Sequence, residues 1–181
     1  MTKSISRREA GALALLTALV GGTASAHEEV RRPGPHHGMG LTVGDQRYAM
    51  DTLSAGSAAL LTSRMALSRA ASQTVRQFAE FEVREQTGIA QILTEISGMR
   101  SPPPPDPRMA AMADQLRRTG GSVFDRLYVQ GQIEGHTQLL RIQETYLRGG
   151  RNPHIRHIAL LSRGQILDHL TVLRHLQGMH G

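Results

Sequence analysis

Apolar residues recur at intervals of three and four along most of the chain, with polar residues between them. This spacing places apolar side chains on one face of an α-helix, and no segment shows the alternating β-branched pattern of a strand. The pattern predicts long helices over residues 47–71, 72–98, 122–148 and from 153 onward, and a short helix over 107–118. We therefore expect an all-α fold, in which residues 47–177 form an antiparallel four-helix bundle with one short extra helix.

Residues that favour helix ends stand at the boundaries of these segments. Ser72 and Asn152 can accept hydrogen bonds from the first turn of the helices that follow them, and Pro153 suits a first helical position. The four prolines of Pro102–Pro105 cannot continue a helix and predict an extended connector before the short helix.

The inward faces of two helices are predicted from their apolar stripes. In the first helix Leu53, Leu60 and Leu67 stand seven residues apart, while Leu61 and Met65 define a competing face. The small residues at positions 55–59 allow a neighbouring helix to approach closely. In the last helix one stripe contains Ile155, Ile158, Gln165, His169, Val172 and Leu176.

Four polar residues lie on the predicted buried stripes, and burying such a group without a partner costs about 1–3 kcal/mol. They are Glu82 and Gln86 in the second helix, His136 in the third long helix and His169 in the last. One interpretation is that they hydrogen-bond to one another and fix the register of the helices, with Arg64 neutralising Glu82.

The second interpretation is a metal site, because inward carboxylates and histidines on facing helices are how bundles bind metals. The candidate ligands are Glu82, His136, Asp168 and His169, and the candidate metals are iron and copper. No helix carries the Glu-x-x-His spacing of di-iron bundles, so the expected site is incomplete or mononuclear. The function that this interpretation implies is metal binding or a metal-dependent oxidoreductase.

The first 26 residues have the pattern of an export signal. Lys3, Arg7 and Arg8 precede an apolar run over residues 12–20, and the small residues up to Ala26 suit signal peptidase. We expect cleavage after Ala26 and a periplasmic protein, by either the twin-arginine or the general route. Residues 27–46 contain many His, Pro and Gly and predict a flexible arm.

The composition excludes several kinds of site and partner. The chain has a net charge of +6, with 21 basic residues of which Lys3 is the only lysine, and it contains no Cys or Trp. These facts exclude disulfides and thiolate metal sites, and 3% aromatic residues argue against a base-stacking nucleic-acid surface. The arginines are scattered among acids, so no nucleic acid is expected as a partner.

Known catalytic motifs such as H-E-x-x-H and G-x-S-x-G are missing from the sequence. This favours a binding or envelope-stress accessory role, with a protein or small ligand as partner, over catalysis. The cleaved chain retains no run long enough to span a bilayer, and its features leave room for association with the envelope and for a homodimer.

Histidines and methionines near both ends are ligand types for copper. They are His36, His37 and Met39 on one side and His175, Met179 and His180 on the other. Copper binding by these tails is a third hypothesis beside the inner site.

Three short segments resemble the bacterial family known as domain of unknown function 4142. They are residues 75–79 (VRQFA), residues 124–129 (FDRLYV) followed by His136, and residues 168–170 (DHL). Members of that family are exported, are often labelled outer-membrane proteins and are grouped with ferritin-like bundles, so the resemblance implies that fold. Members commonly carry Asp-His where this chain has Glu85-Gln86, and no acid lies between Thr52 and Arg76, so the resemblance does not imply a full di-iron site.

Overall fold

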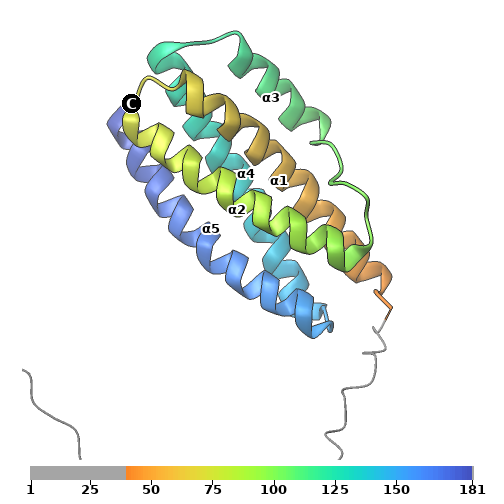
Figure 1. Cartoon of the computed structure of the whole chain (residues 1–181). Helices are drawn as coiled ribbons and strands as arrows, with labels where there is room; N and C mark the ends of the chain where they lie inside the picture. Colours follow the sequence, from red (N-terminus) through yellow and green to blue (C-terminus); the bar gives the residue numbers. More distant parts are fainter. Residues whose placement is uncertain (1–39, 181) are drawn as a thin grey trace, which may run out of the picture. The chain divides into compact units, whose positions relative to one another are not determined.

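The computed structural model describes residues 40–180, without the side chain of His180. Within that range the chain forms five helices: α1 (Val43–Arg69), α2 (Gln73–Ser97), α3 (Pro107–Arg117), α4 (Gly121–Gly149) and α5 (Pro153–His180) (Figure 1). The described residues contain no β-strand, which confirms the all-α class. In this range no helix combines the length and apolarity needed to cross a membrane. The predicted signal, residues 1–26, and residues 27–39 of the predicted arm lie outside the described residues.

The predicted helix ends of α2 and α5 are confirmed. The Ser72 hydroxyl accepts from the backbone N–H of Val75 at 3.4 Å, and α2 ends at Gly98, whose φ of 70° suits a residue without a Cβ. Before α5, Asn152 Oδ1 accepts from the backbone N–H of His154 at 3.0 Å. Local hydrogen bonding therefore determines where these helices begin.

Helix α1 begins four residues before its predicted start at Arg47. Thr42 Oγ1 accepts from Asp45 N at 3.2 Å, and Thr42 N donates to Asp45 Oδ2 at 2.9 Å. This reciprocal capping box stabilises the first turn of the helix. Residues 43–46, which the sequence predicted as part of the arm, are therefore helical.

Helix α1 runs antiparallel to both α2 and α4. Near the start of α1, Gln46 Nε2 donates to the carbonyl of Ser97 at the end of α2 at 3.4 Å. Asp45 accepts a hydrogen bond from the hydroxyl of Tyr146, which lies near the end of α4. The first turn of α1 thus lies beside the last turns of two other helices.

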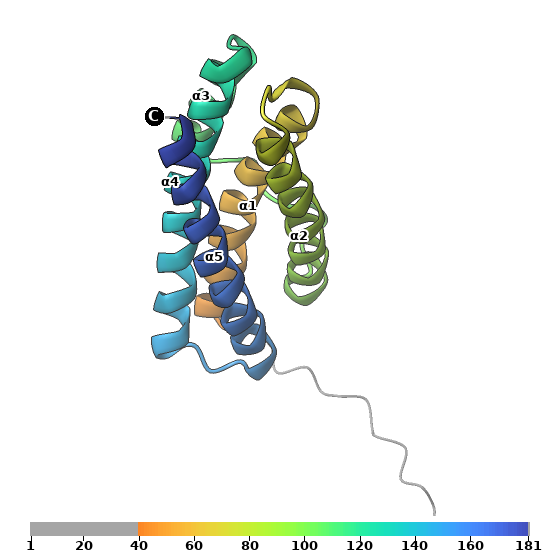
Figure 2. The ribbon, with the colours of Figure 1, turned by 90° about the vertical axis from the view of Figure 1, so that its left-hand side faces the viewer.

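Helix α4 runs in the same direction as α2, because both begin at one end of this group of helices. Asp125, near the start of α4, accepts from the backbone N–H groups of Ala71 (3.0 Å) and Ser72 (2.7 Å), just before α2. The connector after α2 and helix α3 return the chain along the outside of α1 and α4, and α5 then packs against α4 (Figures 1 and 2). Among the long helices that are neighbours, α2 and α5 approach each other least closely.

Small residues, and not the predicted leucine stripe, form the buried face of α1. Leu67 is 38% exposed, and Leu60 is only half-buried. The buried positions are Ala49, Ala55, Gly56, Ala58, Ala59, Ser63 and Ala66, together with Tyr48, Thr52, Leu53 and Thr62. Because α1 lies against both α2 and α4, small side chains allow the close approach and the leucines lie at its flanks.

The predicted stripe of α5 is also partly wrong. Val172 is 45% exposed and Gln165 is exposed, whereas Ile166, Leu170 and Leu173 are buried. The buried stripe is therefore turned by about one residue relative to the predicted one over the second half of the helix.

The apolar core of the described residues is divided along the bundle. One cluster surrounds Phe124 and Tyr128, another surrounds Tyr48 and Tyr146 at the opposite end, and a smaller one contains Leu139 and Leu170. Buried polar side chains lie among these clusters, and most of them meet near the middle of the long helices.

Candidate metal centre

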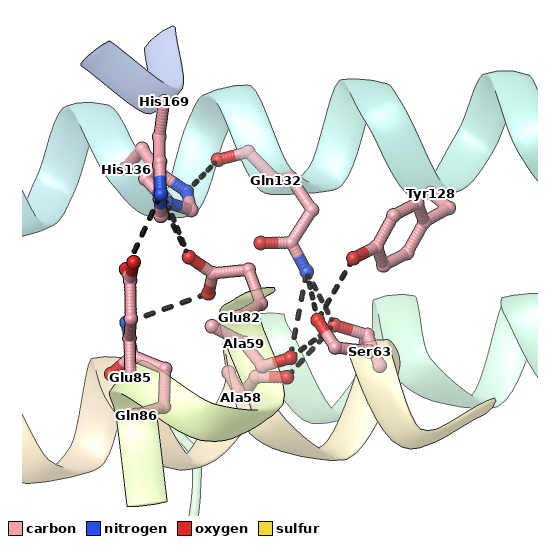
Figure 3. Close-up of polar contacts among 11 residues, drawn as sticks. Ala58, Ala59, Ser63, Glu82, Glu85, Gln86, Tyr128, Gln132, His136 and His169 are labelled. Atoms are coloured by element: carbon pink, nitrogen blue, oxygen red, sulfur yellow. Dashed lines mark hydrogen bonds and ion pairs between the residues drawn. The ribbon is translucent and has the colours of Figure 1, made fainter. Parts of the chain in front are cut away.

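Three of the four predicted ligands meet in the interior. Glu82 of α2, His136 of α4 and His169 of α5 point toward one another (Figure 3). Glu82 Oε1 lies 3.0 Å from His136 Nε2 and 2.8 Å from His169 Nδ1, and the two nitrogens are 3.2 Å apart. The side chains of Glu82 and His136 are 0% and 1% exposed, and that of His169 is 13% exposed.

The fourth predicted ligand, Asp168, is not part of this group. It is exposed on the surface of α5. Successive residues of a helix point about 100° apart, so Asp168 turns away from the interior when its neighbour His169 turns toward it. The structure therefore brings Glu82, His136 and His169 together, but not Asp168.

Each histidine holds its second nitrogen in a hydrogen bond. His136 Nδ1 donates to the backbone carbonyl of Gln132 at 2.7 Å. His169 Nε2 lies 3.3 Å from Glu85 Oε2, near the outside of the bundle. A histidine that binds a metal almost always donates its other N–H to a carbonyl or carboxylate in this way.

These outer partners determine which atoms face the centre. A carbonyl oxygen can only accept, so the proton of a neutral His136 lies on Nδ1, and the Glu85 carboxylate places that of a neutral His169 on Nε2. His136 Nε2, His169 Nδ1 and Glu82 Oε1 then present three lone pairs to one point. Three acceptors without a donor repel one another, so the point requires a cation, either a proton or a metal ion.

The pKa values describe how protons occupy the point when no metal does. Burial raises the pKa of Glu82, but hydrogen bonds and charge attraction from His136 and His169 outweigh it and lower the pKa to about 2. Burial lowers the pKa of His169, but hydrogen bonds to Glu82 and Glu85 outweigh it and raise the pKa to about 9. At neutral pH the metal-free centre is therefore an ion pair of a carboxylate and an imidazolium.

The chain matches a known family over most of its length. Residues 31–176 match the family described as Domain of unknown function (DUF4142). The chain belongs to the DUF4142 family. No curated protein and no solved structure matches it.

In this DUF4142 chain Gln86 contacts Glu82, as the sequence predicted for the members of the polar cluster. Gln86 Nε2 donates to Glu82 Oε2 at 3.4 Å, so the second carboxylate oxygen also has a partner. Gly56 of α1 makes room for Gln86, because a Cβ at position 56 would lie 2.6 Å from Gln86 Oε1. Arg64 is exposed, so the interpretation that it neutralises Glu82 is wrong.

Gln132 extends the polar group toward α1. Its Nε2 donates to Thr62 Oγ1 at 2.9 Å and to Ser63 Oγ at 3.3 Å. Its Oε1 is the one buried side-chain polar atom without a hydrogen-bond partner among the described residues. Figure 3 shows this oxygen pointing toward Glu82. An unsatisfied acceptor there suits a donor bound at the centre, such as a water on a metal ion.

The positions of the three facing atoms also suit a metal ion. Nitrogen and oxygen ligands that lie about 2.0–2.2 Å from an ion are roughly 3 Å from one another. The observed separations of 2.8–3.2 Å agree with that value. Two histidines and one carboxylate on one side of an ion are the ligand set of many mononuclear non-haem iron sites.

The structure does not test the predicted copper tails. His36, His37 and Met39 lie outside the described residues, and so does the side chain of His180. His175 and Met179 lie on the exposed part of α5.

Proposed function

We propose that this protein binds one transition-metal ion through Glu82, His136 and His169. One observation carries the proposal: Glu82 Oε1, His136 Nε2 and His169 Nδ1 converge on one point in the interior, and the outer nitrogens of both histidines contact Gln132 and Glu85. In the metal-free protein a proton on His169 occupies this point as part of the ion pair with Glu82, and a metal ion can take the place of that proton.

Iron and copper are the metals that we propose. Imidazole nitrogen and carboxylate oxygen suit both, and the absence of Cys leaves no thiolate to favour a softer site. The three ligands come from three helices, so they are positioned by rigid elements and not by loops. This fits binding at a preformed site.

The test is the metal content of protein purified without an affinity tag. We expect about one ion per chain in the wild type and none in the His136→Ala/His169→Ala variant. Asp168→Ala is the matched control, because it removes an exposed acid next to His169 and should retain the metal. If the double variant does not fold, Glu82→Gln replaces it, since this change keeps the volume and removes the anionic ligand. A wild type that binds no iron or copper on titration would contradict the proposal.

We also propose that the helices form a ferritin-like bundle and that the protein is exported to the periplasm. The directions of α1, α2, α4 and α5, with a long return between α2 and α4, support a ferritin-like antiparallel bundle.

The basic and apolar pattern of residues 1–26 supports export to the periplasm. Mass spectrometry of the periplasmic protein should find His27 as its first residue, and an intact N-terminus in the cytoplasm would contradict export.

A second candidate function is the binding of an organic anion, favoured by a separate cavity between α1 and α4. Its volume is about 980 Å³, and its lining includes Arg47, Arg141 and Arg151 around Tyr48 and Tyr146. Cavities of several hundred Å³ with an apolar floor and a few charged groups suit small organic ligands. We expect laurate to bind more tightly than dodecanol and to lose that advantage in Arg141→Gln/Arg151→Gln. Equal binding of the two compounds would contradict this candidate.

A further inference from the structure

A small cavity adjoins the two histidines of the metal centre. Its volume is about 10 Å³, and His136 and His169 form one side of it. A space of roughly this volume holds one water molecule. The three ligands of the proposed metal come from Glu82 and these histidines, so an ion bound there has coordination positions left for a ligand from outside the protein.

We propose that this outside ligand is a single water-sized molecule: water, hydroxide or a diatomic gas such as dioxygen or nitric oxide. The inference rests on the proposed metal site and adds the class of molecule that reaches it. Organic substrates are excluded from the metal by size, so any chemistry at the ion involves small molecules alone.

The walls of the cavity are held in place and cannot easily yield to a larger ligand. Gln143 Oε1 accepts from the Tyr48 hydroxyl at 2.6 Å, and Gln143 Nε2 lies 3.5 Å from Thr52 Oγ1. Gln86 is held between Glu82 and the backbone at Gly56. Gln86, Gln143 and Thr52, three of the polar residues in the lining, therefore already have partners, which favours the present size of the cavity.

Apolar side chains close the rest of the cavity. Ile89 of α2, Leu139 of α4 and Ile166 of α5 contribute to its lining. Leu139 and Ile166 are buried, whereas Ile89 is only half-buried. Toward solvent the lining continues with Glu85 and the exposed Gln165, between the two helices that pack least closely. Of the three apolar lining residues, Ile89 is the one whose truncation enlarges the cavity at least cost to the core.

The test compares two nitrogen donors of different size on iron(II)-loaded protein under anaerobic conditions. Nitric oxide and nitrosobenzene both bind ferrous iron through nitrogen, and only the second carries a phenyl ring. Metal analysis first establishes one iron per chain, and electron paramagnetic resonance and visible absorption then follow the two adducts. We expect the wild type to bind nitric oxide at the iron and not nitrosobenzene.

Ile89→Ala should bind nitrosobenzene at least about tenfold more tightly than the wild type. Ile92→Ala is the matched control, because Ile92 lies on the same helix, is 45% exposed and does not line the cavity. Nitrosobenzene binding to the iron of the wild type would overturn the inference, and so would the failure of nitric oxide to bind. If Ile89→Ala does not fold, the comparison of nitric oxide with nitrosobenzene in the wild type still tests the inference. A protein that takes up no iron contradicts the proposed function itself, which is a separate result.

Discussion

At the scale of single residues, the atoms that matter are the two nitrogens of each histidine. His136 and His169 each use one nitrogen for an outer partner and direct the other at Glu82. Their chemistry is therefore determined by neighbours that do not touch the proposed metal, namely the Gln132 carbonyl and the Glu85 carboxylate.

Metal affinity should depend on pH because a proton competes for the same point. The pKa of His169 is raised to about 9, so below that pH a metal ion must displace a proton from the metal-free protein. We expect the association constant to rise about tenfold per pH unit from pH 7 toward 9 and then to level off. Chelator competition at several pH values measures this slope, and an affinity independent of pH over that range would contradict the assignment.

Glu85→Gln should weaken metal binding although Glu85 is not a ligand. The change removes the negative charge that holds His169 Nε2 and makes His169 a poorer donor, which typically costs about 10–100-fold in affinity. Glu80→Gln, on the exposed side of the same helix, should leave affinity unchanged. Equal affinities of the two variants, measured by the same competition, would show that Glu85 does not position His169.

The sequence predicted part of the centre, and its limits have a physical cause. Glu82, His136 and His169 were predicted because they are polar residues on apolar stripes. Asp168 is the neighbour of His169 but does not lie on the predicted stripe of α5, and the structure places it on the surface. The contact of Gln86 with Glu82 lies within α2 and was predicted, whereas the contact of Glu85 with His169 depends on how closely α5 approaches α2, and no pattern within one helix contains that information.

At the scale of helices, local signals predicted where most helices begin and end, but not which faces they bury. Ser72, Gly98 and Asn152 act through hydrogen bonds and backbone angles of their own neighbourhood. The buried face of α1 instead depends on how close its neighbours lie. A helix in contact with two others buries alanine and glycine, so the leucine stripe was a poor guide to its inward face.

Two glycines allow a matched test of this close approach. Gly56→Ala should destabilise the protein by about 1–3 kcal/mol and weaken metal binding, because the new Cβ displaces Gln86 and with it Glu82. Gly88→Ala places the same methyl group on α2, where nothing lies within 4 Å, and should stabilise the protein by about 0.5–1 kcal/mol. Urea unfolding measures both changes, and a Gly56→Ala variant as stable as Gly88→Ala would contradict the packing account.

At the scale of the whole described unit, residues 40–180, the polar centre joins helices that otherwise pack little against each other. Glu82 and Glu85 of α2 both contact His169 of α5, across the pair of neighbouring long helices with the least close packing. A metal ion at this point would connect α2, α4 and α5. Binding should therefore stabilise the folded arrangement as a whole.

The melting temperature of the protein should therefore rise when the metal binds. A ligand that binds only the folded state stabilises it by about 2.7 kcal/mol at a free concentration of one hundred times Kd, which corresponds to a rise of several degrees in Tm. We expect that rise for the wild type and for Asp168→Ala when iron or copper is added, and none for Glu82→Gln. A rise of the same size in Glu82→Gln would place the bound metal elsewhere in the chain.

The most direct test of the metal centre is the position of the ion in a crystal of metal-loaded protein, located by anomalous scattering at the absorption edge of iron or copper. The account predicts one strong peak about 2.0–2.2 Å from Glu82 Oε1, His136 Nε2 and His169 Nδ1. A crystal of loaded protein with no peak at this point, or with its peak at the histidines near either end of the chain, would contradict it.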